Sequence, residues 1–310
     1  MAIDIGAGIN IGGGITFAPP IPGRKAIFGY GYAAAGQVSM TNLVTINGIV
    51  GNDVTGVGTV RENLAAAGYG GDKAIFGYGY SVPLANVSIT NLVSNTGVVA
   101  NDTTGVGTGR AGVAAAGYGG DKALFGFGGG DNPGVKNLIA NTGVVATDTA
   151  TVGLGRSGLA AASYGTDKAI FGYGQQVASP NNLTAITNLV SNTGVVASNT
   201  SGVGTARSSL AAAGYGTDKA IFGYGITSVS LSMTNLVNNT GVVANDVTGV
   251  GTARYGLAAA EYGVGTSIFG YGYGGSLVSL TNLVSNTGVV ANDTTGVGTA
   301  RQALAAAVYA

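Results

Sequence analysis

The sequence repeats one unit six times, and this repetition limits the possible folds more than any other feature does. Three markers recur in a fixed order. The first is "KAIFGYG" or a close variant, starting at Lys25, Lys73, Lys122, Lys168, Lys219 and, as "SIFGYG", Ser267. The second is "NLV" or "NLI", starting at Asn42, Asn91, Asn137, Asn188, Asn235 and Asn282. The third is an arginine followed three residues later by Leu/Val-Ala-Ala-Ala, at Arg61, Arg110, Arg156, Arg207, Arg254 and Arg301. A period near 48 residues is typical of propeller blades.

Each unit divides into four short strand-like segments. "LAAAGYG" leads through a turn such as "GGDK" to "KAIFGYG", and "ITNLVSN" is followed by "TGVVAND". The second segment should alternate, with Ala26, Phe28 and Tyr30 on one face and Ile27, Gly29 and Gly31 on the other. Three alanines between glycines are too few to nucleate a helix, so we expect an all-β chain. The length differences fall in the loops after the second segment, at residues 31–39, 80–89, 128–135, 174–186, 225–233 and 272–280.

The two ends of the repeat region predict a closed ring. The first repeat begins at Lys25 with a second strand, and the chain finishes at Ala310 just after a first strand, "LAAAVYA". The C-terminal strand can therefore complete the first blade. Because small four-stranded sheets bury both faces when they pack radially, residues 25–310 are predicted to form a six-bladed β-propeller with four-stranded blades.

Composition excludes several classes of function. The 13 Lys and Arg residues balance 13 Asp and Glu residues, so the basic surface of a nucleic-acid-binding protein is not expected. There are no cysteines and no histidines, which removes disulfides, thiolate chemistry and the commonest metal ligand. We expect no cofactor and no metal. The sequence contains no apolar run of 18 residues and no signal peptide, so membrane insertion is not expected.

The order of the markers resembles the kelch repeat. There an arginine and a small apolar strand precede a strand ending in a glycine pair, and here "R-x-x-LAAAGYG", "KAIFGYG" and "TNLVSN" take those places. The glycine pair is split as "GYG", and the fourth-strand tryptophan of kelch repeats is missing.

Residues 25–310 are also similar, in order and spacing, to kelch-like repeats in structural proteins of tailed bacteriophages. The segment "IDIGAGINIGGGITF" resembles the N-terminal arm of such proteins. The resemblance implies a tail, fibre or decoration protein of the virion, assembled in the host cytoplasm. Its partners would be other virion proteins, reached through residues 1–24 and the variable loops.

Residues 1–24 are predicted to be a docking arm. Apolar residues alternate with glycine and lead into "APPIPGR", whose prolines make an extended connector. Such a segment can join a neighbouring sheet by strand addition. The alternative is a disordered terminus.

The acid eight residues before each arginine is the main candidate site. The pairs are Asp53 with Arg61, Asp102 with Arg110, Asp148 with Arg156, Asn199 with Arg207, Asp246 with Arg254, and Asp293 with Arg301. A single pair of this kind would suit an acid–base site, but an active site normally needs one asymmetric constellation. Six near-equal copies indicate a structural brace between blades, formed by charge-assisted hydrogen bonds.

Six tyrosines end the first strands, at Tyr69, Tyr118, Tyr164, Tyr215, Tyr262 and Tyr309. They either ring one mouth of the central channel, where phenols can stack on sugars, or pack between blades. The Asp-Lys pairs beginning at Asp72, Asp121, Asp167 and Asp218 are interpreted as hairpin turns.

These patterns predict a non-enzymatic propeller that serves as a rigid binding platform. The alternative is a lectin-like propeller that binds carbohydrate for attachment to a host surface. An enzyme is disfavoured because the chain lacks His, Cys and any single carboxylate cluster.

Overall fold

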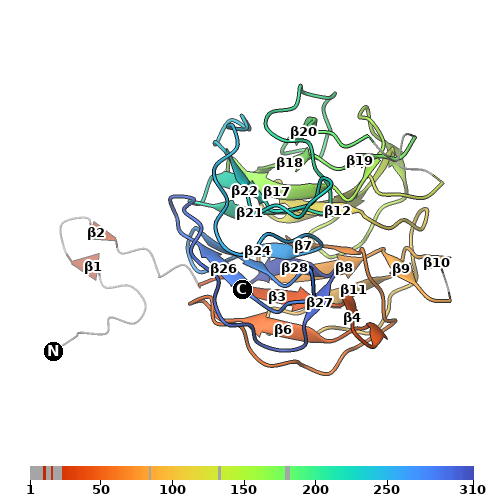
Figure 1. The fold of residues 1–310 in the computed structure, drawn as a ribbon, viewed down its shortest axis with the longest axis horizontal. Helices are drawn as coiled ribbons and strands as arrows, with labels where there is room; N and C mark the ends of the chain where they lie inside the picture. The colour runs from red at the N-terminus through yellow and green to blue at the C-terminus, as the bar shows by residue number, and fades with distance from the viewer. Residues whose placement is uncertain (1–9, 12–14, 17–22, 84, 132–133, 179–181) are drawn as a thin grey trace.

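The computed structural model describes residues 10–11, 15–16, 23–83, 85–131, 134–178 and 182–310. These residues form strands, turns and loops without a helix, so the predicted all-β class is confirmed (Figure 1). None of the described segments is a helix long and apolar enough to cross a membrane.

Six small antiparallel sheets repeat the same three strands. In strand order they are sheet 1 (β28-β3-β6), sheet 2 (β7-β8-β11), sheet 3 (β12-β13-β14-β15), sheet 4 (β17-β18-β20), sheet 5 (β21-β22-β23) and sheet 6 (β24-β25-β26). The first strands are β7 (Ala65–Tyr69), β12 (Ala114–Tyr118), β17 (Ala160–Tyr164), β21 (Ala211–Tyr215), β24 (Ala258–Tyr262) and β28 (Ala305–Tyr309). The second strands are β3 (Lys25–Gly29), β8 (Lys73–Gly77), β13 (Lys122–Gly126), β18 (Lys168–Gly172), β22 (Lys219–Gly223) and β25 (Thr266–Gly270). The third strands are β6 (Thr41–Val44), β11 (Thr90–Val93), β14 (Val135–Ile139), β20 (Thr187–Val190), β23 (Thr234–Val237) and β26 (Thr281–Val284).

The predicted fourth strand, "TGVVAND" and its variants, does not form a regular strand in the described chain; in sheet 3 a two-residue strand, β15 (Thr149–Ala150), follows this segment and pairs with β14. The segment and the residue after it meet the third strand at separate points, such as Val44 with Val50 and Thr41 with Val54. Between these two points the third strand advances three residues, from Thr41 to Val44, while the outer segment advances four, from Val50 to Val54. The extra residue is a β-bulge, which interrupts the regular hydrogen-bond ladder. The buried Asn42 side chain donates to the Gly51 carbonyl (3.0 Å) inside this bulge. A side-chain hydrogen bond thus takes the place of one backbone hydrogen bond between the two segments.

The predicted alternation of side chains along the second strand is wrong at Tyr30. The strand ends at Gly29, and Tyr30 has a φ of 62°, in the left-handed region. The Tyr30 ring therefore packs with Ile27 and with Phe76 of sheet 2, whereas Phe28 packs against sheet 6 on the other side. The "GYG" sequence allows this turn because Gly31, with a φ of 105°, lies against the backbone of Gln302 and Leu304.

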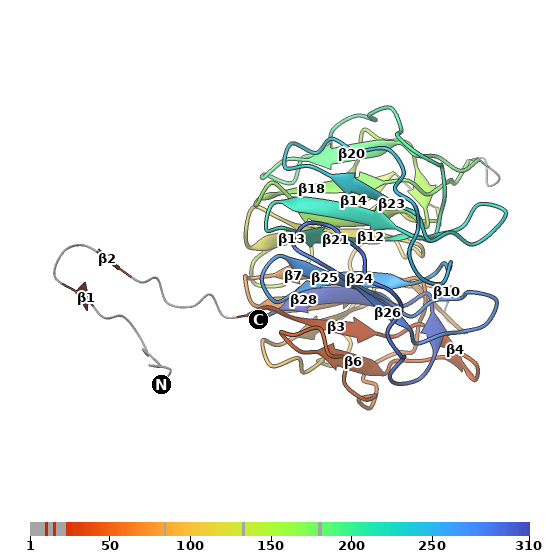
Figure 2. The ribbon, with the colours of Figure 1, turned by 60° about the vertical axis from the view of Figure 1, so that its left-hand side comes forward.

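The six sheets are neighbours in a closed cycle. Each first strand contacts two other first strands, in the order β7, β12, β17, β21, β24, β28 and back to β7. The C-terminal strand β28 pairs along five residues with β3, the second strand of the first repeat. Sheet 1 is thus built from both ends of the repeat region, and Lys25 pairs with Tyr309 close to the C-terminus (Figures 1 and 2).

Two closed rings of backbone hydrogen bonds link neighbouring sheets. At one end, the amide just before each first strand donates to the equivalent carbonyl of the neighbouring sheet, through Asn63, Ala303, Gly256, Ser209, Gly158, Gly112 and back to Asn63 (2.7–3.0 Å). At the other end, the residue after each first strand donates to the hairpin of the next sheet. These bonds run from Gly70 to Asp121, Gly119 to Asp167, Gly165 to Asp218, Gly216 to Gly265, Gly263 to Arg24 and Ala310 to Asp72 (2.6–3.1 Å).

The hydrophobic core lies between neighbouring sheets. Each cluster combines first- and second-strand residues of one sheet with second- and third-strand residues of the next. Gly29 shows why glycine ends the second strand, because a Cβ there would lie 2.7 Å from Cζ of Phe76. The same close approach recurs between Gly77 and Phe125 and around the rest of the cycle.

The two ends of the molecule differ in what they carry. The loops after the second strands form short pairings that include β4 (Tyr32–Ala33), β5 (Gly36–Gln37), β9 (Tyr80–Ser81), β10 (Ala85–Asn86), β16 (Arg156–Ser157), β19 (Gln175–Gln176) and β27 (Arg301–Gln302). Several of them lie opposite the chain ends (Figures 1 and 2). We call this the loop end, and the end at Lys25 and Ala310 the arm end. Within the predicted arm, β1 (Asn10–Ile11) pairs with β2 (Ile15–Thr16), and most of residues 1–22 lie outside the described residues.

Arg24 and Ala310 occupy the position of a hairpin turn, which predicts that residues 24–310 tolerate circular permutation. In sheet 2 the turn is Gly70-Gly71-Asp72, and in sheet 1 Ala310 and Arg24 hold the first and third of these places. We expect a variant of residues 24–310, with one added glycine joining Ala310 to Arg24 and new ends between Gly71 and Asp72, to fold and melt within a few degrees of the parent.

Circular dichroism and thermal melting would test this permutant. As a control, new ends placed between Ile75 and Phe76, within β8, should prevent folding. Equal melting of the two permutants, or an unfolded first permutant, would contradict the closed hydrogen-bond cycle.

Candidate functional site

An arginine is completely buried at the start of each sheet. The six side chains, Arg61, Arg110, Arg156, Arg207, Arg254 and Arg301, are all 0% exposed. Arg207 shows the full set of contacts. Its Nε donates to the Tyr224 carbonyl (2.8 Å), Nη1 to the Thr205 carbonyl (3.0 Å) and Nη2 to Oδ1 of Asn235 (2.8 Å).

The acid that faces each arginine comes from the next copy of the repeat. Nη1 of Arg207 lies 3.9 Å from Oδ1 of Asp246. The other pairs are Arg61 with Asp102, Arg110 with Asp148, Arg254 with Asp293 and Arg301 with Asp53, at 3.5–3.9 Å. The pairing predicted within one copy is therefore wrong. Each arginine follows the loop that enters a new sheet, so it meets the outer edge of that sheet.

The aspartates are held mainly by uncharged groups. Asp246 accepts hydrogen bonds from the Thr205 amide and hydroxyl (3.0 and 2.7 Å) and from Nδ2 of Asn235 (2.9 Å). The arginine lies beyond normal hydrogen-bond length, so its contribution is mainly an electrostatic attraction. The aspartate thus holds the entering loop against the sheet edge.

The asparagines of the "NLV" marker connect the two charges, and sequence reasoning missed them. All six, Asn42, Asn91, Asn137, Asn188, Asn235 and Asn282, are 0% exposed. Asn235 accepts from Arg207 and donates from Nδ2 to Asp246 and to the Ala244 carbonyl. A polar residue that recurs in all six copies within an apolar strand was the signal that could have revealed this role.

An aromatic ring of the preceding sheet covers each guanidinium. The Arg207 guanidinium lies 4.4 Å from the Tyr173 ring centre, and the Tyr173 hydroxyl donates to the Val203 carbonyl (3.0 Å). Burial raises the pKa of Tyr30, Tyr173, Tyr224 and Tyr271 to about 12. These phenols therefore stay protonated. Each donates a hydrogen bond from its sheet to the loop that leads to the next sheet.

The five aspartates of this network have pKa values below the ordinary value of 3.8. Partial burial by itself would raise the pKa of Asp53, but the Thr299 and Asn42 hydrogen bonds and the Arg301 charge outweigh it. The pKa is lowered for the same reasons, with hydrogen bonds and an arginine charge outweighing burial, at Asp102, Asp148, Asp246 and Asp293.

The junction between sheets 3 and 4 departs from this pattern at three positions. Phe127 replaces the tyrosine, Leu154 the threonine and Asn199 the aspartate. Arg156 still donates to Asn188 (2.8 Å), and its Nε and Nη1 are buried without a hydrogen-bond partner, as are those of Arg110. No carboxylate is within ion-pair distance of Arg156 in the described part of the chain, and burial lowers its pKa to about 10. Asn199 accepts instead from Asn188 and from the Leu154 amide.

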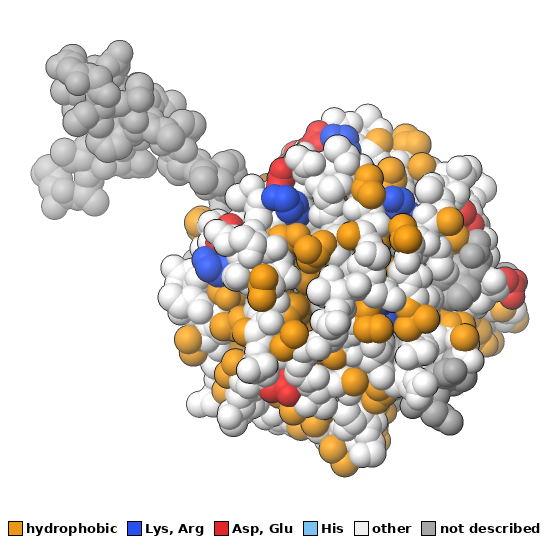
Figure 3. Space-filling view, turned by 90° about the horizontal axis from the view of Figure 1, so that it is seen from above, with side chains coloured by type: hydrophobic (Ala, Val, Ile, Leu, Met, Phe, Trp, Pro, Cys, Tyr) orange, Lys and Arg blue, Asp and Glu red, His pale blue; other side chains and the backbone are white. Residues whose placement is uncertain are grey.

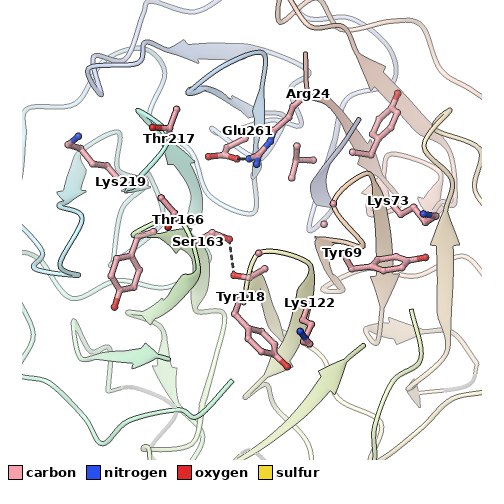
Figure 4. Close-up of a pocket in the computed structure, with 17 residues that line it drawn as sticks. Arg24, Tyr69, Lys73, Tyr118, Lys122, Ser163, Thr166, Thr217, Lys219 and Glu261 are labelled. Atoms are coloured by element: carbon pink, nitrogen blue, oxygen red, sulfur yellow. Dashed lines mark hydrogen bonds and ion pairs between the residues drawn. The ribbon is translucent and has the colours of Figure 1, made fainter. Parts of the chain in front are cut away.

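The six terminal tyrosines pack between sheets. Tyr69, Tyr118, Tyr164, Tyr215, Tyr262 and Tyr309 are only 3–6% exposed. Each ring covers the turn glycine of the next sheet, as Tyr69 does at Gly143 and Tyr309 at Gly97. Figure 4 shows the Tyr69 and Tyr118 rings pointing away from the centre of the ring of sheets, as expected for inter-sheet packing.

A small cavity of about 120 Å³ opens at the arm end of the axis. Its wall includes Lys73, Lys122 and Lys219, and Arg24 crosses it to bind Glu261 (Nη1–Oε2 2.5 Å; Figure 4). Lys73, Lys122, Lys168 and Lys219 pair with the adjacent turn aspartates at 2.7–3.4 Å, and their side chains are 41–45% exposed. Exposed pairs of this kind contribute little to stability.

The residues placed by the structure contain no group of three or more acidic, His or Cys side chains arranged to hold a metal ion. No family model matches the chain, and no curated protein is significantly similar to it in sequence.

The depressed aspartate pKa values predict loss of stability in acid. A group whose pKa is lower in the folded state contributes stability above its unfolded pKa, and that contribution is lost as the pH falls through its folded value. The free energy of unfolding should therefore hold from pH 7 to about 5 and fall progressively below 3.8. Urea unfolding between pH 7 and pH 2 measures this, and Asp246→Asn should reduce the acid-dependent loss. A flat profile would contradict it.

Restoring the missing charge beside Arg156 should stabilise the protein. In Asn199→Asp, the new carboxylate would face the buried guanidinium as Asp246 faces Arg207. We expect a gain of about 1 kcal/mol in the free energy of unfolding, or roughly 2 °C in Tm. The gain should be present at pH 7 and vanish below the folded pKa of the new aspartate. The reverse change, Asp246→Asn, is the matched control and should lower Tm; an unchanged Tm in both variants would contradict the brace.

Proposed function

We propose that residues 25–310 form a six-bladed kelch-like β-propeller that acts as a rigid, non-catalytic platform in a bacteriophage particle. The two closed rings of inter-sheet hydrogen bonds are the observation that carries the propeller assignment. The cyclic contacts of the six first strands and the pairing of β28 with β3 support the same architecture. The blades have three regular strands and a bulged outer segment.

The network of arginine, asparagine and aspartate supports a structural role. Its guanidinium groups are inaccessible to substrate, and its carboxylates are fixed by threonine and asparagine. Catalysis needs groups that touch a reacting molecule, whereas these groups touch one another. The network therefore serves to join loop, sheet and neighbouring sheet.

The opposite placement of arm and loops suits a connecting protein. Arg24, at the base of the arm, is fixed to Glu261 and to the Gly263 amide at the arm end. Each turn after a third strand adds an exposed aliphatic side chain on this side, namely Ile49, Val98, Val144, Val195, Val242 and Val289 (58–66% exposed). The variable loops lie at the loop end. One end would thus attach the protein and the other would present a surface that differs from blade to blade.

The composition of the surface is in keeping with assembly. Figure 3 shows one face with few charged side chains, where apolar groups are scattered among uncharged ones. Placement in a phage particle rests on the resemblance of residues 25–310 and of the arm to structural proteins of tailed phages. The partners would be other virion proteins, contacted through residues 1–24 and the loops.

Carbohydrate binding ranks second as a function. The six terminal tyrosines are buried between sheets, so their rings offer no open face for stacking on sugars. A glycan partner would have to bind the variable loops at the loop end.

Incorporation into particles tests the proposal. The full chain and a variant lacking residues 1–22, which keeps Gly23 and Arg24, should melt alike, because the ring is closed without the arm. We expect only the full chain to co-purify with phage particles, as measured by density-gradient centrifugation and mass spectrometry.

A full chain absent from particles would overturn the virion role. Binding to a glycan array that is lost after exchange of one variable loop would favour the carbohydrate-binding alternative instead.

A further inference from the structure

An apolar cleft lies between sheets 2 and 3, among residues of the third strands and the outer segments. It has a volume of about 220 Å³, and its wall includes Thr90, Leu92, Val106 and Gly143. Its rim is open to solvent, since Val144 is 66% exposed and Thr104 is exposed.

The neighbouring junction shows what can occupy such a cleft. Lys136 in β14 holds the place that Thr90 holds in β11, because each pairs with the glycine that ends its second strand, Gly126 or Gly77. The Lys136 side chain crosses to sheet 4, where its Nζ donates to the Gly194 carbonyl (2.7 Å).

Gly194 and Gly143 are equivalent positions. Each is the turn glycine covered by the terminal tyrosine of the preceding sheet, Tyr118 for Gly194 and Tyr69 for Gly143. A leucine of the preceding third strand also contacts each of them, Leu138 in one case and Leu92 in the other. The walls therefore match, and the difference lies in the side chain at the Thr90 or Lys136 position.

The site of Lys136 holds an ammonium group without a carboxylate. Lys136 is only 8% exposed, and among the described residues it has no acidic partner within ion-pair distance. Its burial lowers its pKa. The methylene groups of a lysine can line an apolar wall while the ammonium group reaches a polar partner at its end. The turn carbonyl is that partner.

From this internal comparison we propose that the cleft between sheets 2 and 3 is a docking site for a lysine side chain of a partner protein. The stem would lie along Leu92 and Val106, and the ammonium group would bind the Gly143 carbonyl, as Lys136 binds Gly194. The inference rests on the platform role for the identity of the partner and names the chemistry that this part of the platform recognises.

The partner's lysine reaches this cleft from solvent, across the rim at Thr104 and Val144. At the junction between sheets 3 and 4, the side chain of Lys136 already binds the equivalent carbonyl, so no partner lysine is expected there. The methylene stem of lysine supplies only apolar contacts. An uncharged side chain of equal length should therefore bind more weakly than lysine, because it leaves the Gly143 carbonyl without a hydrogen-bond donor.

A titration of the isolated, isotope-labelled chain tests the proposal. The probe is Nα-acetyl-lysine N-methylamide, and its comparison is the norleucine analogue, which has the stem without the ammonium group. We expect saturable amide shifts at Gly143 and Val144 with the lysine probe, and at least fivefold weaker binding of the norleucine analogue.

Two substitutions place at each junction the side chain that the other junction has. Thr90→Lys should fill the cleft as Lys136 does and weaken probe binding there at least tenfold. Lys136→Thr should open a site at the junction between sheets 3 and 4, seen as new shifts at Gly194 and Val195. Thr234→Lys is the matched control, because it places a lysine at the same strand position in sheet 5 and should leave the shifts at Gly143 unchanged.

The proposal is overturned if the norleucine analogue binds equally well, which would mark a purely apolar cleft. It is also overturned if Thr90→Lys folds and leaves the shifts at Gly143 intact, or if no saturation occurs below about 100 mM. Should Thr90→Lys fail to fold, the appearance or absence of the second site in Lys136→Thr decides. Because the assay uses the isolated chain, its failure is separate from failure of incorporation into particles.

Discussion

The buried guanidinium at the start of each sheet is the interaction on which the rest of the structure depends. Removing a charged group from water costs several kcal/mol, and this cost is offset only when its hydrogen bonds are satisfied. At Arg207 the partners come from four separate segments: the loop itself, the turn that follows the second strand, the third strand and the outer edge. These segments must all be in place before the arginine can be buried, so one side chain fixes the geometry of an entire sheet.

The junction between sheets 3 and 4 shows that the members of this network depend on one another. Leu154 and Asn199 replace a threonine and an aspartate that bind each other elsewhere, as Thr205 and Asp246 do. Losing one partner leaves the other unsatisfied, and a paired replacement avoids that cost. Phe127 removes the tyrosine hydroxyl at the same junction, and Lys136 adds a contact found at no other junction in the described chain. The departures are therefore grouped at one place in the cycle.

The sequence was sufficient to predict the number of repeats, the positions of three strands in each unit and the pairing of the last strand with the first. These features follow from periodicity and from turn residues such as Gly and Asp. The partner of each arginine was not predictable from spacing, because the arginine lies beside its own copy's acid in sequence but belongs to the next sheet in space. The direction of the Tyr30 ring was also missed, since it depends on a positive φ that strand alternation does not anticipate. The cleft beside Thr90 became visible only when two junctions were compared in three dimensions.

The placement of the arm and the loops at opposite ends has a mechanical consequence. Each sheet's strands run from one end to the other, and the hydrogen bonds between them lie across that direction. A pull between the arm and the loops would therefore load all the bonds of β3 with β28 and β6 together, in shear. Bonds loaded in parallel must break at nearly the same moment, whereas bonds opened from one end break in sequence. The fold thus resists tension best along the line that joins the arm end to the loop end.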